Sequence, residues 1–252
     1  MTGTLIFVAE SESFSSLVLT LSSFQAIEIT DLPGFMNTLI ETRAAMIVVD
    51  GGHTHWRDFV IGPKSSAATR RIPILLVCDS EERRAEATLA GADLTASWSE
   101  LERNCLQLVK DFARIPDPKM LEQLSCECQE GLPSLAAQGL HEFNQGNYYL
   151  QHDMFEEQWV NTAGPVRDLY RAILQVGVAY YQIENDNYRG ALKMLQRSVQ
   201  WLHILPDRCQ GIDVEQLRRD SYAVRAELER LGPQRLEALD RTLLKPLIWN
   251  AP

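Results

Sequence analysis

Histidine and carboxylate side chains gather in one short stretch of the second half of the chain. His152, Asp153, Glu156 and Glu157 lie within one helical turn or so of each other, just after a turn that contains Gly146. On a helix of 3.6 residues per turn, His152 and Glu156 share one stripe, and Asp153 and Glu157 share the neighbouring one. An imidazole and a carboxylate placed in this way can hold a divalent metal, provided that further ligands come from another helix.

Two interpretations of this cluster are open. In the first, Gln175 or His141 approaches from an adjacent helix and completes a metal site around His152 and Glu156. In the second, His152, Glu156 and Gln175 satisfy one another as a buried hydrogen-bond network that fixes the packing of the helices. The first interpretation predicts an enzyme or a metal-binding protein, and the second predicts a structural role.

The elements that position reactive groups differ between the two halves. In the first half, short apolar runs at Leu5–Val8, Met46–Val49 and Ile72–Val77 fit strands that are buried on both faces of a parallel sheet. Helix-like segments lie between and after these runs, and one of them, Glu81–Ala90, is followed by Gly91 as a helix stop. Repeated βα units of this length predict an α/β doubly wound fold.

Three motifs of the first half carry a resemblance to a known family. They are Val48-Val49-Asp50-Gly51, Ile72-Pro73-Ile74-Leu75-Leu76-Val77 and Ala90-Gly91-Ala92-Asp93. With them, residues 1–114 resemble the receiver domain of two-component response regulators. The resemblance implies a flavodoxin-like fold, places Asp50 at the phosphoacceptor position, and implies Mg²⁺ as the cofactor of that site.

Other positions depart from the receiver pattern. The family's acidic pair maps to Ala9 and Glu10, its Ser or Thr maps to Cys78, and its Lys falls near Trp98. Phosphoryl transfer depends on a cation and on positive groups that neutralise the transferring oxygens, and these groups are incomplete here. We therefore expect a pseudo-receiver that binds partners, with a phospho-switch at Asp50 as an alternative.

The second half is expected to be helical throughout. Two prolines in Ile115-Pro-Asp-Pro118 break helical continuity, so residues 115–130 are expected to form a linker. Apolar residues at helical spacing then predict an all-α helical bundle over residues 131–247. Asp213, with Gln216 three residues later, predicts a capped helix that begins at Val214.

Five groups of residues in the second half recur in the order of a helical family of bacteria and archaea. The groups are Phe143-Asn144 with Gly146, His152-Asp153 to Glu156-Glu157 with Trp159, Leu174-Gln175, Asn187-Tyr-Arg-Gly190-Ala191, and Gly211-Ile212-Asp213. The second half thus resembles domain of unknown function family 309. That family usually has His-Glu in place of His152-Asp153, and often a His in place of Tyr181 or Gln182. These departures favour the hydrogen-bond network over the metal site, and the resemblance implies a fold rather than an activity.

Charge, apolar runs and cysteine content indicate which partners and which cellular compartment to expect. A formal net charge of −10 leaves no basic field for nucleic acid, so we do not expect nucleic acid as a main partner. No apolar run approaches the roughly 20 residues that span a bilayer, and the start of the chain has no basic region of a signal peptide. Five scattered cysteines, an odd number, indicate free thiols rather than disulfides. We therefore expect a cytoplasmic protein that does not contact the membrane.

Taken together, these observations predict a two-domain regulatory protein that acts through protein contacts. A metal-dependent hydrolase centred on His152 and Glu156 is the competing class. A phospho-switch at Asp50 is the third. We expect a protein partner, and by analogy with receiver domains we also consider a homodimer.

Overall fold

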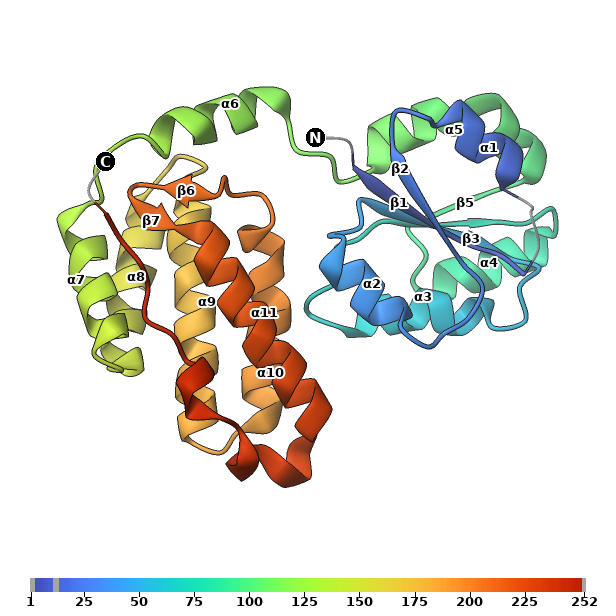
Figure 1. Ribbon diagram of the computed structural model, residues 1–252. Helices are drawn as coiled ribbons and strands as arrows, with labels where there is room; N and C mark the ends of the chain where they lie inside the picture. Colours follow the sequence, from blue (N-terminus) through green and yellow to red (C-terminus); the bar gives the residue numbers. More distant parts are fainter. Residues whose placement is uncertain (1–2, 11–13, 251–252) are drawn as a thin grey trace. The chain divides into compact units, whose positions relative to one another are not determined.

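The computed structural model describes residues 3–10 and 14–250. Its contacts divide the chain into two compact units, Met1–Pro116 and Asp117–Pro252 (Figure 1). The first unit contains a sheet with helices, and the second is mainly helical. Each unit is described by itself.

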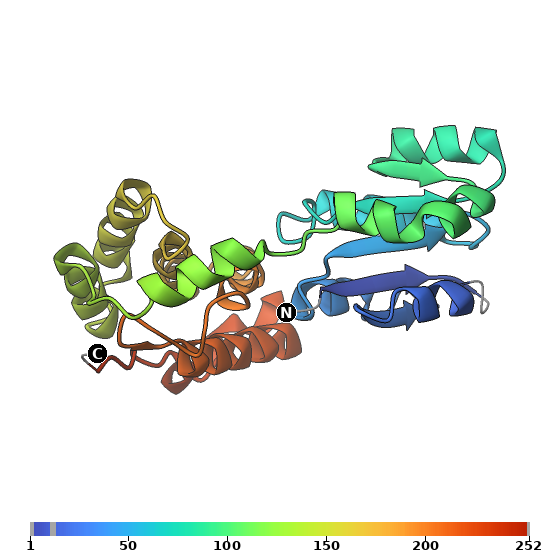
Figure 2. The same ribbon diagram turned by 90° about the horizontal axis from the view of Figure 1, so that it is seen from above.

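The first unit is built on a five-stranded sheet in which every pair of neighbouring strands is parallel. The strand order is β2-β1-β3-β4-β5, and Figure 2 shows the strands side by side from above. The strands are β1 (Thr4–Val8), β2 (Gln25–Ile29), β3 (Met46–Asp50), β4 (Ile74–Val77) and β5 (Leu94–Ala96). The three apolar runs of the sequence are β1, β3 and β4, which confirms the predicted α/β class.

Helices cover both faces of this sheet. Alternate strand residues point to opposite faces, so Phe7 and Val48 pack with α1 and α5, whereas Val8 and Val49 pack with α2, α3 and α4 (Figure 1). This two-sided burial explains why the strands read as continuous apolar runs. The helices are α1 (Ser15–Thr20), α2 (Phe35–Glu41), α3 (Trp56–Ser65), α4 (Glu81–Ala90) and α5 (Trp98–Phe112).

Local signals set the ends of these helices. Gly91 ends α4 with a φ of 109°, a left-handed conformation that glycine adopts without strain. Ser97 and Glu100 form a reciprocal capping box at the start of α5. The stop predicted at Gly91 is therefore confirmed.

The second unit is an array of helices with one small two-stranded sheet. In the series α7, α8, α9, α10 and α11, each helix packs against the next. Ring contacts join Tyr148 to Tyr180 and Phe155 to Tyr170, so α8 and α9 run in opposite directions. The elements are α6 (Pro118–Glu127), α7 (Ser134–Asn144), α8 (Tyr148–Asn161), α9 (Arg167–Glu184), α10 (Tyr188–Leu202), β6 (Arg208–Cys209), β7 (Ile212–Asp213), α11 (Val214–Leu231), η1 (Pro233–Ala238) and η2 (Arg241–Leu243). The capped start of α11 is confirmed, because Asp213 Oδ1 accepts a hydrogen bond from the Gln216 backbone N–H at 2.8 Å.

The segment 115–130, which we expected to link the two halves, contains α6. Pro118 does not break this helix but begins it, because proline is tolerated in the first turn, where its missing N–H has no helical partner. Asp117 caps the helix through the Lys119 N–H. Leu124 and Cys128 are buried in the core of the helical unit, so most of the segment belongs to that unit.

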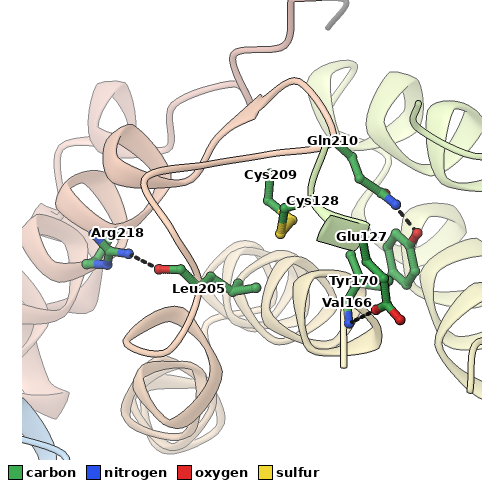
Figure 3. The surroundings of a disulfide bond; sticks show 8 residues. All are labelled: Glu127, Cys128, Val166, Tyr170, Leu205, Cys209, Gln210 and Arg218. Carbon is green, nitrogen blue, oxygen red and sulfur yellow. Dashed lines mark hydrogen bonds between the residues drawn. A yellow bond between two sulfur atoms is a disulfide. The ribbon is translucent and has the colours of Figure 1, made fainter. Parts of the chain in front are cut away.

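Two of the five cysteines are joined, which corrects the expectation that all are free. Cys128 and Cys209 form a disulfide although they are 81 residues apart (Figure 3). The fold brings β6 against the end of α6, a proximity that the spacing of the cysteines in the sequence does not reveal. Cys78, Cys105 and Cys126 are free thiols.

Among the described residues, none of the helices combines the length and the apolar character needed to cross a bilayer.

Candidate functional sites

The first candidate site lies at the carboxyl ends of β1 and β3. Glu10 follows β1, and Asp50 is the last residue of β3. β1 and β3 are neighbours in the sheet, and the chain crosses from one side of β1 to the other between them. In doubly wound sheets, ligands bind outside the carboxyl ends of the strands at such a point.

Asp50 organises the turn that follows β3. Its Oδ1 accepts a hydrogen bond from the Gly52 N–H at 2.7 Å, and its carbonyl oxygen accepts one from the His53 N–H at 3.0 Å. Gly51 lies tightly against β4, since a Cβ at this position would be 2.7 Å from the Cβ of Cys78. A glycine is therefore needed where the β3 loop passes the end of β4.

Glu10 holds the same loop from the other side. Its Oε1 accepts a hydrogen bond from the Thr54 N–H at 2.7 Å and lies 3.7 Å from His53 Nδ1. The hydrogen bonds from Thr54 lower the pKa of Glu10 below its usual value. The carboxylate that the receiver resemblance assigns to metal binding is thus bonded to backbone.

His53 completes this arrangement and was not predicted from the sequence. Its ring is buried and packs edge-on against Phe59. Nδ1 faces the His55 N–H at 2.9 Å, and Nε2 faces the Thr30 carbonyl oxygen at 3.0 Å. A backbone N–H can only donate, so Nδ1 accepts and the proton of the neutral ring is on Nε2. A histidine just beyond a strand end was the available signal.

Structural contacts surround Cys78 and Trp98, the two further residues that the receiver resemblance singles out. Arg83 donates to the Gly51 carbonyl oxygen at 2.9 Å, and Arg84 donates to the Cys78 carbonyl oxygen. The Trp98 ring packs on Phe14 and is half-buried at the start of α5. The residue near which the receiver resemblance places a lysine is therefore a tryptophan that packs against the core of the first unit.

The second candidate site is the histidine and carboxylate cluster of α8. His152 Nδ1 lies 3.0 Å from Asp153 Oδ1, a contact between neighbours in the chain. Glu156 and Glu157 are exposed. Gln175, on α9, is buried, and its side-chain oxygen finds no hydrogen-bond donor among the described residues. The expected buried network of His152, Glu156 and Gln175 is not formed.

The metal interpretation of the α8 cluster requires a third ligand. Within residues 3–10 and 14–250, no three His, Cys, Asp or Glu side chains are grouped so that they could hold a metal ion. His152 and Glu156 both project from one helix, so a metal site there would need a ligand from another helix.

Trp159, the last residue of the α8 cluster, joins three helices. The guanidinium of Arg171 on α9 lies 4.6 Å from the Trp159 ring and 4.2 Å from the ring of Trp201 on α10. Arg167, one turn earlier on α9, lies 5.2 Å from the same Trp159 ring. Such cation–π contacts stabilise the packing of α8, α9 and α10. In the sequence, the spacing of Arg167 and Arg171 by one helical turn was the available signal for this contact.

A pocket opens beside the first turn of α8. It has a volume of about 180 Å³ and is lined by Gly146, Asn147, Tyr148, Tyr149, Leu150, Tyr181 and Glu184. The rings of Tyr149 and Tyr181 are 6.1 Å apart, and Tyr149 is 64% exposed. Burial raises the pKa of Glu184, an effect that the charge of Arg241 partly offsets. The pocket is therefore lined by three tyrosines and one carboxylate, and Tyr149 is the exposed tyrosine among them.

Comparison with known proteins supports the second of the two resemblances. Residues 136–194 match a family described as a domain of unknown function (DUF309). The match covers less than half of the chain and runs from α7 into α10, so it includes the α8 cluster and the pocket residues. A search of curated proteins gives no match.

Proposed function

We propose that this protein is an atypical, response-regulator-like regulator that acts through protein contacts of both units. The first unit would serve as a pseudo-receiver with a flavodoxin-like fold, and the second as a helical output domain. The strand order β2-β1-β3-β4-β5, with helices on both faces, supports the proposal because it is the order of flavodoxin-like sheets. Asp50 at the end of β3 agrees with the phosphoacceptor position.

The observation that carries the proposal is the hydrogen bond between Glu10 and Thr54. A working receiver site needs free carboxylates near Asp50 to hold a cation, whereas Glu10 is bonded to the loop at 2.7 Å. Ala9 supplies no second carboxylate, and Trp98 supplies no positive charge. Without these groups, the charge on a transferring phosphoryl group would be poorly stabilised.

In the helical unit, the pocket beside α8 is the site that we assign to a protein partner. Tyr149 and Leu150 are exposed next to Tyr181, so the pocket lies in an exposed apolar area. Aromatic rings are enriched where proteins bind one another, because they bury a large area at a low cost in side-chain entropy. The proposal also assigns the protein to the cytoplasm, where regulators of this type act.

Phosphorylation is the first test. We expect no added phosphoryl group when the purified protein is incubated with acetyl phosphate and Mg²⁺ and its intact mass is measured. Asp50→Asn, treated in the same way, controls for labelling at other residues. One phosphoryl group on the unmodified protein that is missing from Asp50→Asn would replace the pseudo-receiver by a phospho-switch.

Partner binding is the second test. Tagged protein is cross-linked in an extract of its source cells, and the captured proteins are compared with those of a Tyr149→Ala, Tyr181→Ala variant. We expect the variant to lose at least one protein that the matched control Val160→Ala retains, since Val160 is exposed on α8 outside the pocket. Identical captures would contradict the assignment of the pocket. Stoichiometric metal that is lost in His152→Ala would favour the hydrolase instead.

A further inference from the structure

The disulfide between Cys128 and Cys209 attaches the first helix of the second unit to the rest of that unit. Cys128 directly follows α6, and Cys209 is in β6 (Figure 3). α6 begins at the boundary between the two units, with Asp117 as its cap. The disulfide therefore fixes the segment through which the two units are connected.

The β6 side of the disulfide is held in place by contacts that do not involve sulfur. Tyr170, on α9, donates its hydroxyl hydrogen to Gln210 Oε1 at 2.8 Å, and burial raises the pKa of Tyr170 to about 12, so this donor keeps its proton. Trp249 Nε1 donates to the Gln210 carbonyl oxygen at 3.1 Å. Cys209 itself is fully buried. This side would stay in place if the disulfide were opened.

The α6 side has weaker anchors. Leu124 is the buried residue of α6, whereas Met120 and Leu121 are partly buried. Two hydrogen bonds support the end of the helix: Gln210 N–H to the Cys128 carbonyl oxygen at 2.7 Å, and Val166 N–H to Glu127 Oε2 at 2.8 Å. A helix of ten residues is marginal in water without tertiary contacts. Attachment of α6 therefore depends strongly on the covalent bond.

We propose that Cys128–Cys209 is a reversible redox site, with dithiol reductants as its substrates, and that its state sets the length of the tether between the two units. In the oxidised state, α6 is docked and the tether is short. In the reduced state, α6 detaches and frays, so the tether extends to about residue 128. The inference does not depend on the proposed partner site, and it shares with the proposed function only the cytoplasmic location.

The chemistry is thiol–disulfide exchange. A thiolate of the dithiol attacks the sulfur of Cys128, a residue that is 7% exposed whereas Cys209 is 0% exposed, and Cys209 leaves as a thiolate. The second thiol of the reductant then attacks the mixed disulfide and releases Cys128. Two electrons and two protons pass from the dithiol to the two cysteines, and the dithiol becomes a cyclic disulfide. An oxidised disulfide compound such as oxidised glutathione reverses the reaction.

Compartment chemistry agrees with a regulatory role. Disulfides in cytoplasmic proteins, where they occur, are mostly transient or redox-sensing. This step of the inference rests on the cytoplasmic location given under the proposed function. The pair also lies next to Cys126, an exposed free thiol that offers a control for chemical labelling.

Hydrogen exchange measured by mass spectrometry tests the inference on the full chain. The oxidised protein and the protein reduced with dithiothreitol are compared at residues 118–127, with residues 188–202 of α10 as an internal reference. On reduction, we expect exchange at 118–127 to rise at least tenfold more than exchange of the reference, because α6 opens by itself whereas α10 opens only with the whole unit. Oxidised glutathione should restore the slow rate.

Three variants and three outcomes make the test decisive. Cys128→Ser and Cys209→Ser should each show fast exchange at 118–127 under oxidising conditions, and Cys126→Ser should behave like the unmodified protein. A protein that forms no disulfide with oxidised glutathione would overturn the proposal. So would equal exchange in both redox states, and so would acceleration of α10 by the same factor as α6, which would show that α6 opens only together with the whole unit.

Discussion

Both units place a histidine beside carboxylates, but they hold these groups in different ways. In the first unit, His53 and Glu10 are bonded to backbone groups of separate segments, from Thr30 to Thr54. In the second unit, His152 contacts Asp153, its neighbour in the chain, and Glu156 is exposed. Long-range contacts in the second unit are made elsewhere, by the disulfide and by Trp159.

The difference follows from the geometry of the two folds. The carboxyl ends of parallel strands meet at one edge of a sheet, so residues that are distant in sequence converge there. A single helix instead spreads its side chains along its own surface, and they converge with others only where a second helix packs on the same stripe. A dense cluster in the sequence is therefore weak evidence for a site when one helix supplies all of it.

The largest expected effect concerns the long-range contact of the helical unit. Cys128→Ser should lower the free energy of unfolding of this unit by about 4 kcal/mol, since the disulfide closes a loop of 81 residues in the unfolded chain. Chemical denaturation followed by far-UV circular dichroism measures the change. Cys126→Ser should leave the curve unchanged, and a similar loss in that control would mean that the serine itself is harmful.

Replacement of the two histidines compares the sites directly. His53→Ala should cost about 2–3 kcal/mol, because it empties a buried position and leaves the Thr30 carbonyl and the His55 N–H without their partner. His152→Ala should cost less than about 1 kcal/mol, as is usual for a partly exposed side chain with a local contact. Equal losses in the two unfolding curves would show that the α8 cluster has long-range contacts after all.

The contribution of Glu10 to stability should decrease as the pH falls. The pKa of Glu10 is lowered in the folded protein, so its contribution is present above the usual value of 4.5 and is lost as the pH falls through the lowered pKa. Glu10→Gln should thus melt below the unmodified protein at neutral pH, and the two melting temperatures should converge in acid. A constant difference in melting temperature between pH 3 and pH 7 would contradict the role of the Thr54 contact.

The smallest effect, of opposite sign, is expected at Glu184 beside the pocket. Burial raises its pKa in the folded protein, so the fold loses stability as the pH rises from the usual value of 4.5 through the raised one. Glu184→Gln removes this loss. The melting temperature of the variant should be slightly higher than that of the unmodified protein at neutral pH and equal to it in acid. A thermal melt at several pH values measures both variants, and a lower melting temperature at neutral pH would indicate that Arg241 outweighs burial.

Local patterns predicted much of the fold. The apolar runs gave β1, β3 and β4, Gly91 gave the end of α4, and Asp213 with Gln216 gave the start of α11. These features depend on residues within a few positions of each other. At the candidate sites, the sequence placed Asp50 at a strand end and His152 with Glu156 on one helix, but it did not indicate what surrounds them.

The sequence by itself determined the elements, because periodicity, caps and turns act over one or two helical turns. Tertiary structure decided which side chains meet. It bonded Glu10 to Thr54, buried His53, left Glu156 exposed, and joined Cys128 to Cys209. Each of these outcomes depends on how distant segments pack, and such packing is set by the burial of the whole core rather than by any short pattern.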